Sequence, residues 1–225
     1  MKKNTYIFAI LALSLLASTA GRTVCAEETG SKEYQLKAAF LYNFVMFVDS
    51  HRFQQLPKDG EAVDPNEPIL IGILGQDPFG QAFEALKGRH VKNRRVVVKR
   101  FKGFSAFADD DGQVPARHPQ LDAITKCHVL FVCASERHHH NAILGPIRKQ
   151  SILTVADTPG FLEAGGMINF LIEDKKVRFE INTAAAERAK LQVRAKLLRL
   201  ARRIVKEDAY DGGDDKEHDA KDEKT

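Results

Sequence analysis

Three consecutive histidines, His138 to His140, follow Cys133 closely enough to suggest a metal site with Cys-x4-His spacing. Thiolate and imidazole groups are the preferred ligands of zinc. Adjacent side chains on a helix point in different directions, however, so the three histidines could not all reach one ion. Further ligands with conventional spacing are lacking in the sequence. We therefore favour a polar helix start after Ser135, and we expect neither a metal nor another cofactor.

A second pattern, IGILGQDPFG, places Gly72, Gly75 and Gly80 after a predicted strand and loosely resembles a phosphate-binding turn. It fits neither GxGxxG nor GxxxxGK[ST]. The amides near Asp77 and Phe79 could meet an anion at a helix N-terminus. Because Asp77 is itself placed to cap those amides, we favour a purely structural turn.

Catalytic signatures are missing from the rest of the sequence. Asp157-Thr158-Pro159-Gly160 resembles the Asp-Thr-Gly of aspartic proteases, but the proline interrupts the motif and a second copy is not found. A nucleophile elbow, a His-Glu-x-x-His motif and a recognisable Cys–His pairing are also not found. The sequence therefore predicts a protein that is not an enzyme.

The clearest local structure is an antiparallel hairpin near the C-terminus. Met167–Ile172 and Val177–Asn182 are short runs of strand-forming residues separated by a charged tetrapeptide. If Asp174 and Lys175 form the turn, apolar residues pair on one face because side chains alternate between faces. The predicted pairs are Ile172 with Val177, Phe170 with Phe179, and Ile168 with Ile181.

The other face of this hairpin carries polar side chains that packing alone does not require. Asn169 is predicted to lie opposite Glu180, with Arg178 and Asn182 as neighbours, and basic residues of the last predicted helix point outward or toward the hairpin. The candidate residues for binding a ligand or a partner are Asn169, Arg178, Glu180, Asn182 and Arg194. The alternative is a solvent-exposed edge whose ion pair contributes about 0 to 1 kcal/mol. A covered face would favour the site, because buried charges need partners.

The other predicted elements alternate between strands and helices. A first helix, Glu33–Val48, has an apolar stripe of Leu36, Phe40, Phe44, Phe47 and Val48, and a loop covers Asp49–Pro68. Strands are predicted at 69–74, 95–101, 129–133 and 152–156. Helices are predicted at 77–87, 136–149 and 193–205. The last of these helices is expected to bury Leu197, Leu198, Ala201, Ile204 and Val205. This order predicts a single-domain α/β fold, a mostly parallel sheet with flanking helices and a C-terminal antiparallel hairpin.

Both ends of the chain differ in composition from this domain, which we assign to residues 32–206. Lys2 and Lys3 precede the apolar run Tyr6–Ala17, which is too short to span a bilayer, so residues 1–26 are predicted to be a signal peptide cleaved after Ala20 or Ala26. Residues 207–225 contain nine acidic residues and three lysines and are predicted to be a disordered tail. We expect a secreted, periplasmic bacterial protein.

Net charge is distributed unevenly between these parts. The tail carries −6 and the predicted signal peptide +3, so the total of +4 leaves +7 for residues 27–206. A basic domain suits an anionic ligand, a membrane surface or a protein partner. A solvated surface with a solubilising tail explains the same charges, so the charges do not decide between these readings.

Two cysteines in the domain, Cys127 and Cys133, would be expected to pair in an oxidising compartment. The run HVLFV between them reads as one strand, and six residues at about 3.3 Å each separate the two by roughly 20 Å. A disulfide needs Cα atoms within about 7 Å. Unless the strand breaks, the two residues are buried thiols.

Several of these segments together resemble a known family. KAAFLYNFVMFVD, IGILGQDPFG, CHVLFV, and ILTVADTPGFLEAGGMINFLIEDKKVRFEIN followed by AKLLRLARRIV are similar, in this order, to the YfiR/HmsC-like periplasmic regulators. The resemblance covers residues 33–205. Its most specific parts are Gly165–Phe170 and Val177–Asn182.

The resemblance implies a small periplasmic α/β domain, often a homodimer, that represses an inner-membrane GGDEF-type diguanylate cyclase by binding its periplasmic portion. Cyclic di-GMP output, and with it biofilm formation and motility, would then respond to envelope signals. The resemblance also implies an outer-membrane partner or a small-molecule ligand in some members, and no nucleic acid. A small-molecule sensor or carrier is the alternative function. The sparse cysteines here argue against the redox-sensing form suggested for cysteine-richer relatives.

Overall fold

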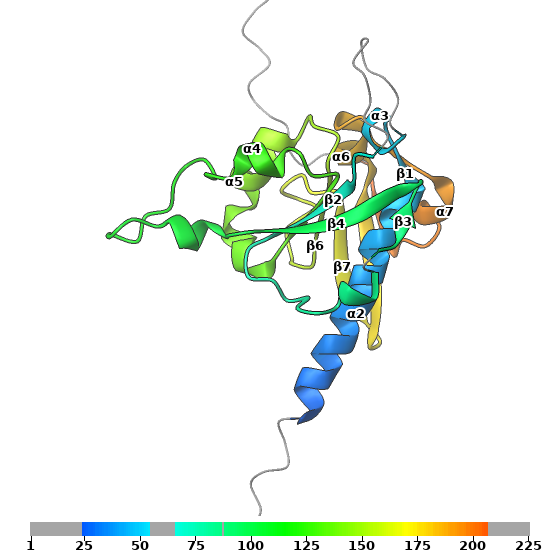
Figure 1. Ribbon diagram of the computed structural model, residues 1–225, viewed down its shortest axis with the longest axis horizontal. Coiled ribbons are helices and arrows are strands. Elements are labelled where there is room, and N and C mark those ends of the chain that lie inside the picture. Colours follow the sequence, from blue (N-terminus) through cyan, green and yellow to red (C-terminus); the bar gives the residue numbers. More distant parts are fainter. Residues whose placement is uncertain (1–23, 55–65, 87, 207–225) are drawn as a thin grey trace, which may run out of the picture.

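The computed structural model describes residues 24–54, 66–86 and 88–206, with side chains from residue 32 onward. The predicted n- and h-regions of the signal peptide, most of the predicted loop at 49–68 and the predicted acidic tail lie outside these residues. Within the described part of that loop, β1 (Val48–Asp49) and α3 (His51–Gln54) form. Figure 1 shows one body in which the first turns of α2 (Val24–Phe47) project beyond the sheet.

An eight-stranded sheet in the order β10-β8-β7-β6-β5-β2-β4-β3 forms the centre of the fold. Its strands are β2 (Ile69–Leu74), β3 (His90–Val91), β4 (Arg94–Phe101), β5 (Val129–Val132), β6 (Leu153–Ala156), β7 (Ile168–Glu173), β8 (Lys176–Asn182) and β10 (Arg203–Val205). Only the β7–β8 and β3–β4 pairs are antiparallel. The predicted mostly parallel α/β fold is confirmed.

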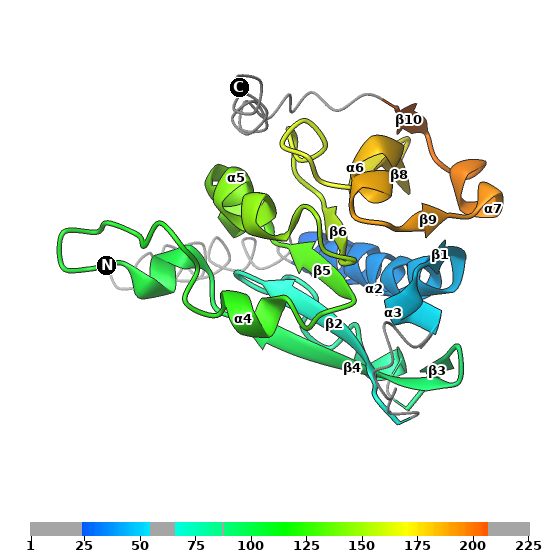
Figure 2. The same ribbon diagram turned by 90° about the horizontal axis from the view of Figure 1, so that it is seen from above.

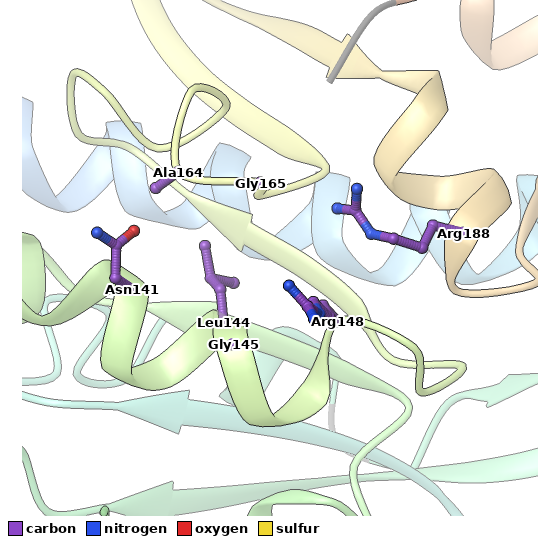
Figure 3. A pocket seen from close by; sticks show the side chains of 7 residues that line it. All are labelled: Asn141, Leu144, Gly145, Arg148, Ala164, Gly165 and Arg188. Atoms are coloured by element: carbon purple, nitrogen blue, oxygen red, sulfur yellow. The ribbon is translucent and has the colours of Figure 1, made fainter. Parts of the chain in front are cut away.

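Helices cover both faces of the central strands, as Figure 2 shows. One apolar cluster joins α2 to Ile71, Phe131 and Val155. The other joins α4 (Leu121–Ile124) and α5 (His140–Leu144) to Leu130 and Val132. This double coverage explains why β5 and β6 are buried at every residue and read as continuous apolar runs.

The predicted hairpin is confirmed in its register. Ile168 pairs with Ile181, Asn169 with Glu180 and Phe170 with Phe179. The turn residues Asp174 and Lys175 both have positive φ angles, of 50° and 59°. A two-residue turn of this kind matches the right-handed twist of the flanking strands. The α-helix α6 (Thr183–Arg188) begins directly where β8 ends.

The predicted apolar stripe of the first helix is confirmed in part: Phe44 and Val48 are buried, and Phe40 and Phe47 pack against the same core. Leu36 is 46% exposed, and the buried face is made of Lys37, Ala38, Leu41, Phe44, Val45 and Val48. Lys37 also lies on the buried face, where it finds an anionic partner in Asp157 after β6, which the local pattern does not reveal.

The predicted last helix at 193–205 was wrong. The segment instead forms β9 (Gln192–Val193), the short α7 (Ala195–Leu198) and β10. Of its predicted inward residues, Leu197 is buried and Ile204 is 39% exposed. The edge of β8 has backbone groups that need hydrogen-bond partners, and Arg202 N donates to Phe179 O at 2.8 Å. This sheet pairing outweighs the helical propensity of the segment.

Two other predicted helices are shorter and partly of 3₁₀ type. The predicted helix at 77–87 was wrong: residues 77–86 form turns and the short 3₁₀ helix η1 (Glu84–Leu86). Residues 136–149 form η3 (Ala134–His139), α5 and η4 (Gly145–Ile147). Gly145 and Pro146 explain the second break, because proline lacks the amide that would continue the helix.

Cys127 and Cys133 are both free and buried, on either side of β5. The prediction of thiols in place of a disulfide is confirmed. Burial raises the pKa of Cys127 to about 11 and that of Cys133 further still, where nearby carboxylates add to the effect. Both thiols therefore remain protonated near neutral pH.

At the amino ends of β5 and β2, a buried histidine is placed against two arginines. His128 accepts a hydrogen bond from Leu70 N at 3.2 Å, and its Nε2 lies 3.1 Å from Arg94 Nη2. Burial is the largest cause that lowers the pKa of His128, to about 3, and the charges of Arg52 and Arg94 add to it. His128 is therefore neutral in the folded protein.

This histidine predicts a loss of stability in acid. Below pH 6.5 the unfolded chain binds a proton at His128 that the folded protein does not bind until pH approaches 3. The free energy of unfolding should fall across this window by up to about 1.4 kcal/mol per pH unit. Urea unfolding between pH 7 and 4 measures the slope. His128→Asn should reduce it, whereas His90→Asn, at an exposed position, should not; equal slopes in the wild type and His128→Asn would refute the assignment.

Candidate functional site

A row of polar side chains crosses the face of the hairpin that turns away from α2. Glu180 in β8 accepts two hydrogen bonds from Arg203 in β10, at 2.8 and 2.9 Å, and Glu163 lies 3.6 Å from the same guanidinium. The hydrogen bonds from Arg203 to Glu180 raise the pKa of the arginine. The pair is half open to solvent, with Arg203 49% and Glu180 19% exposed.

The row continues into the interior through Asn169. Asn169 lies opposite Glu180 in the register, and its Oδ1 accepts a hydrogen bond from Thr158 N at 3.1 Å. Thr158 Oγ1 lies 3.2 Å from Nε2 of the buried His140. Burial, with a smaller effect of His138, lowers the pKa of His140. The row thus runs from a charged pair at the sheet edge to a neutral imidazole in the interior.

Arg178 and Asn182 flank Glu180 in β8 but have different surroundings. Arg178 is exposed and pairs in register with Leu171. Asn182 is buried, caps α6 by accepting from Ala185 N at 3.0 Å, and donates to Leu162 O at 3.3 Å. Arg178 is therefore available to a partner, while Asn182 positions α6 and the turn after β6.

Arg194 lies with a different group. Its guanidinium donates to Asp49 at 2.5 and 3.1 Å, beside Lys92 at 2.8 Å from the same carboxylate. Burial alone would raise the pKa of Asp49, but the hydrogen bonds from Arg194 and Lys92 outweigh it and lower the pKa. Of the predicted residues, the structure thus gathers Asn169, Glu180 and Arg178 on one face. It directs Arg194 to the β1–β9 pair, a separate two-stranded antiparallel sheet.

A buried charged cluster at the carboxyl end of β6 was missed from the sequence. Lys37 is 3% exposed and donates to Asp157 at 2.7 Å, and Glu33 lies 2.5 Å from its Nζ. Tyr34 OH donates to the same Asp157 oxygen at 2.8 Å. Burial, then the charge and hydrogen bond of Asp157, raises the pKa of Tyr34. The sequence indicates this cluster through Lys37, which lies four residues before Leu41 and seven before Phe44, on the same face of the helix.

This cluster fastens α2 to the sheet and does not present a reactive group. The lysine is held by two carboxylates, the phenol is protonated, and the pKa of nearby Cys133 is raised by burial and by Asp77 and Asp157. A nucleophile needs a lowered pKa or an adjacent base to be activated. The cluster therefore serves to position α2 and does not supply an activated nucleophile.

The glycine-rich segment after β2 forms the structural turn that we favoured. Phe79 N donates to Asp77 Oδ1 at 2.7 Å, and Gln76 N donates to Ser135 Oγ at 3.0 Å. Gly75 has φ +104° and lies against Ser135 and Glu136, so a side chain at this position would collide with them. The amides proposed for an anion are thus occupied by the protein's own side chains.

The three histidines are directed to different neighbours. His138 accepts from Arg137 Nε at 2.9 Å, His139 stacks on Phe104 at 4.7 Å between ring centroids, and His140 contacts Thr158. In the part of the chain that the structure describes, no group of three or more histidine, cysteine or acidic side chains is placed to hold a metal ion.

Comparison with known proteins decides the family. Residues 34–202 match the description YfiR/HmsC-like. The chain belongs to the YfiR/HmsC-like family. The resemblance that we predicted for residues 33–205 is confirmed. Members of this family are regulators rather than enzymes, are periplasmic in general and are linked to the control of diguanylate cyclases.

Other comparisons add little to the family assignment. The solved structures similar to this YfiR/HmsC-like chain include a conserved domain protein from Vibrio cholerae O1 biovar El Tor, at 8% identity and a TM-score of 0.48, covering 76% of this chain and 60% of that one. An ABC domain from Streptococcus pneumoniae in complex with L-Trp is 11% identical, with a TM-score of 0.43, covering 60% and 55%. A search of curated proteins gives no match.

The chain thus spans about 60% of the length of the first of these structures. Across residues 24–54, 66–86 and 88–206, no helix combines the length and apolar character needed to cross a bilayer.

The Lys37–Asp157 pair predicts a large energetic coupling. Asp157→Ala should lower the free energy of unfolding by about 3–5 kcal/mol, because it takes one partner from a buried cation. The double variant Lys37→Met, Asp157→Leu should recover most of this loss. Urea denaturation at pH 7 measures both. Asp122→Ala, which breaks an exposed pair with Arg117, should cost less than about 1 kcal/mol; a similar cost for Asp157→Ala would contradict the assignment.

Proposed function

We propose that this protein is a periplasmic regulatory protein that represses an inner-membrane diguanylate cyclase and so lowers cyclic di-GMP signalling in biofilm formation and motility. The family match over residues 34–202 supports this proposal. The geometry agrees with it, because the polar row offers charged and hydrogen-bonding groups at the sheet edge, while the buried cluster holds its ionisable groups in paired states.

The binding face proposed for the cyclase consists of Asn169, Arg178, Glu180 and Arg203. Arg178 is the exposed charge, and the Glu180–Arg203 pair is a geometrically fixed fork that can recognise a polar partner. Asn182 is buried beside this face and caps α6 by accepting a hydrogen bond from Ala185 N. Arg194 belongs to the proposal as a second contact at the β1–β9 pair.

Repression follows if the protein binds the inactive conformation of the cyclase's periplasmic portion more tightly than the active one. A ligand shifts an equilibrium only by its differential affinity for the two states. A signal relieves repression by competing for the regulator, and an outer-membrane partner would supply such competition. A homodimer is the proposed assembly state.

A small-molecule sensor or carrier is the second candidate function. The observation that favours it is the row from the exposed Arg203 to the buried His140, which offers donors and acceptors at several depths. Calorimetry with aromatic amino acids and nucleotides separates the two functions. Under this second function, Glu180→Ala should lose the ligand and keep the cyclase.

Deletion of the gene should raise intracellular cyclic di-GMP, because the cyclase loses its repressor. The nucleotide is measured in extracts of the deletion strain and of the same strain complemented with the wild-type gene. Unchanged levels in a strain that retains its cognate cyclase would refute the proposed function.

Arg178→Glu should weaken binding to the periplasmic portion of the cyclase about tenfold, a loss of about 1.4 kcal/mol. The change reverses an exposed charge on the proposed face, so the fold should be unaffected. Surface-immobilised binding assays measure the dissociation constant. Arg117→Glu, an exposed arginine after η2 (Phe104–Phe107) and outside that face, is the control and should bind like the wild type. Equal affinity of both variants would place the interface elsewhere.

A further inference from the structure

Strand β4 leaves part of one edge of the central sheet open. In the described part of the chain, β3 pairs only with Arg94 and Arg95 of β4, and β2 is the strand partner of the rest. Figure 2 shows β4 at the border of the sheet, with the short β3 beside its beginning. The run 97–101 is thus open on one side over a length of roughly 16 Å. An open edge of this kind can pair with another extended segment.

Backbone hydrogen bonds show which groups of β4 face outward. Val96 N donates to Arg89 O at 3.3 Å, on the β3 side, whereas Phe101 O accepts an amide of the turn after β2 at 3.1 Å. Successive residues of a strand direct their backbone groups to opposite neighbours. The amide and carbonyl of Val98 and of Arg100 therefore point away from the sheet, and the described residues offer them no partner. An added strand would find a donor and an acceptor at each of these residues.

The same edge carries an unbalanced positive charge. Residues 88–102 contain seven arginines and lysines and no acidic residue. Three of the seven have carboxylate partners. The other four are exposed and have no carboxylate partner in the described part of the chain, namely Arg89, Arg95, Lys99 and Lys102. Like charges opposite each other destabilise a strand pair, so this edge disfavours pairing with a second copy of itself and favours an acidic strand.

The two faces of this edge differ in polarity. Arg95 and Lys99 lie on one face and are exposed. Val96 and Val98 lie on the other, where both are half-buried against the apolar cluster around α2. A strand added at the edge would extend both faces, because side chains on neighbouring strands contact one another across a pair. The strand that fits therefore alternates acidic residues, toward the two cations, with apolar residues, toward the two valines.

We propose that the open edge of β4 binds an extended segment of another protein, with alternating acidic and apolar residues, which adds to the sheet as a further strand. Backbone hydrogen bonds provide the pairing in this recognition mode, and side chains provide the selectivity. The chain's own acidic residues at 207–225 are rich in aspartate, which strands disfavour. Four strands lie between β4 and β8, so the inference stands whether or not the proposed function does.

The test titrates the full mature chain at neutral pH with the labelled, end-blocked heptapeptide EVEVEVE, and fluorescence polarisation reports binding. The heptapeptide KVKVKVK has the opposite charge and is the control. The wild type should bind the acidic peptide saturably and the basic one not at all. The acidic peptide should also slow hydrogen exchange at the amides of Val98 and Arg100, which are unprotected in an open edge. Absence of saturable binding of EVEVEVE would overturn the proposal, as would unchanged exchange at both amides.

Two pairs of variants separate strand pairing from charge attraction. Val98→Pro removes an outward donor and leaves the hydrogen bonds to β2 in place, so it should weaken peptide binding about fivefold or more. Val98→Ala keeps the amide and shortens the same side chain, so it should bind like the wild type. Lys99→Glu should weaken binding about tenfold, because it places like charges opposite each other. Arg199→Glu reverses an exposed charge after α7, away from β4, and should not weaken it.

The variants also show when charge alone explains binding. Binding that Lys99→Glu weakens and Val98→Pro leaves unchanged would overturn strand addition, because a contact through charge does not need the outward amide. Circular dichroism checks the fold of each variant. If Val98→Pro does not fold, Lys99→Glu and the hydrogen exchange of the two amides decide together.

Discussion

The packing of α2 against the hairpin is the interaction on which the arrangement of this protein depends. Phe40 and Phe44 of the helix meet Phe170 and Phe179 of the hairpin, with ring centroids 5.2 to 5.9 Å apart. Aromatic pairs at such distances contribute about 0.5–1.5 kcal/mol each beyond their buried area. Because these rings commit one face of β7 and β8 to the core, the opposite face is turned outward. A one-residue slip in the register would exchange the two faces.

A buried ion pair fixes the position of α2 along its axis, which the aromatic rings alone would leave adjustable. Lys37 is dehydrated, and the carboxylates of Asp157 after β6 and of Glu33 offset that cost. The residue after Asp157 is Thr158, whose amide holds Asn169 on the far side of the sheet. Adjacent residues therefore link the helix to one face and the polar row to the other. The contact that holds α2 in the core and the contact that holds the polar row are therefore both made at the carboxyl end of β6.

The sequence predicted what is determined locally and missed what depends on distant partners. Alternation between apolar and polar residues, with a two-residue turn at Asp174, was enough to pair Asn169 with Glu180. The exposed edge of β8 recruited β10, so Arg203 joined Glu180 although a helix was predicted there. The same helix prediction grouped Arg194 with the hairpin, whereas β9 carries it to Asp49.

The protonation states of the buried ionisable side chains suit a binding role better than a catalytic one. Burial raises the pKa of Cys133 and Tyr34, so both keep their protons near pH 7, and it lowers the pKa of His128 and His140, so both imidazoles stay neutral. A thiol without thiolate character is a poor nucleophile. At the edge of the sheet, the Arg203–Glu180 pair remains in contact with solvent. Such pairs discriminate between partners by geometry and charge, as the proposed regulatory function requires.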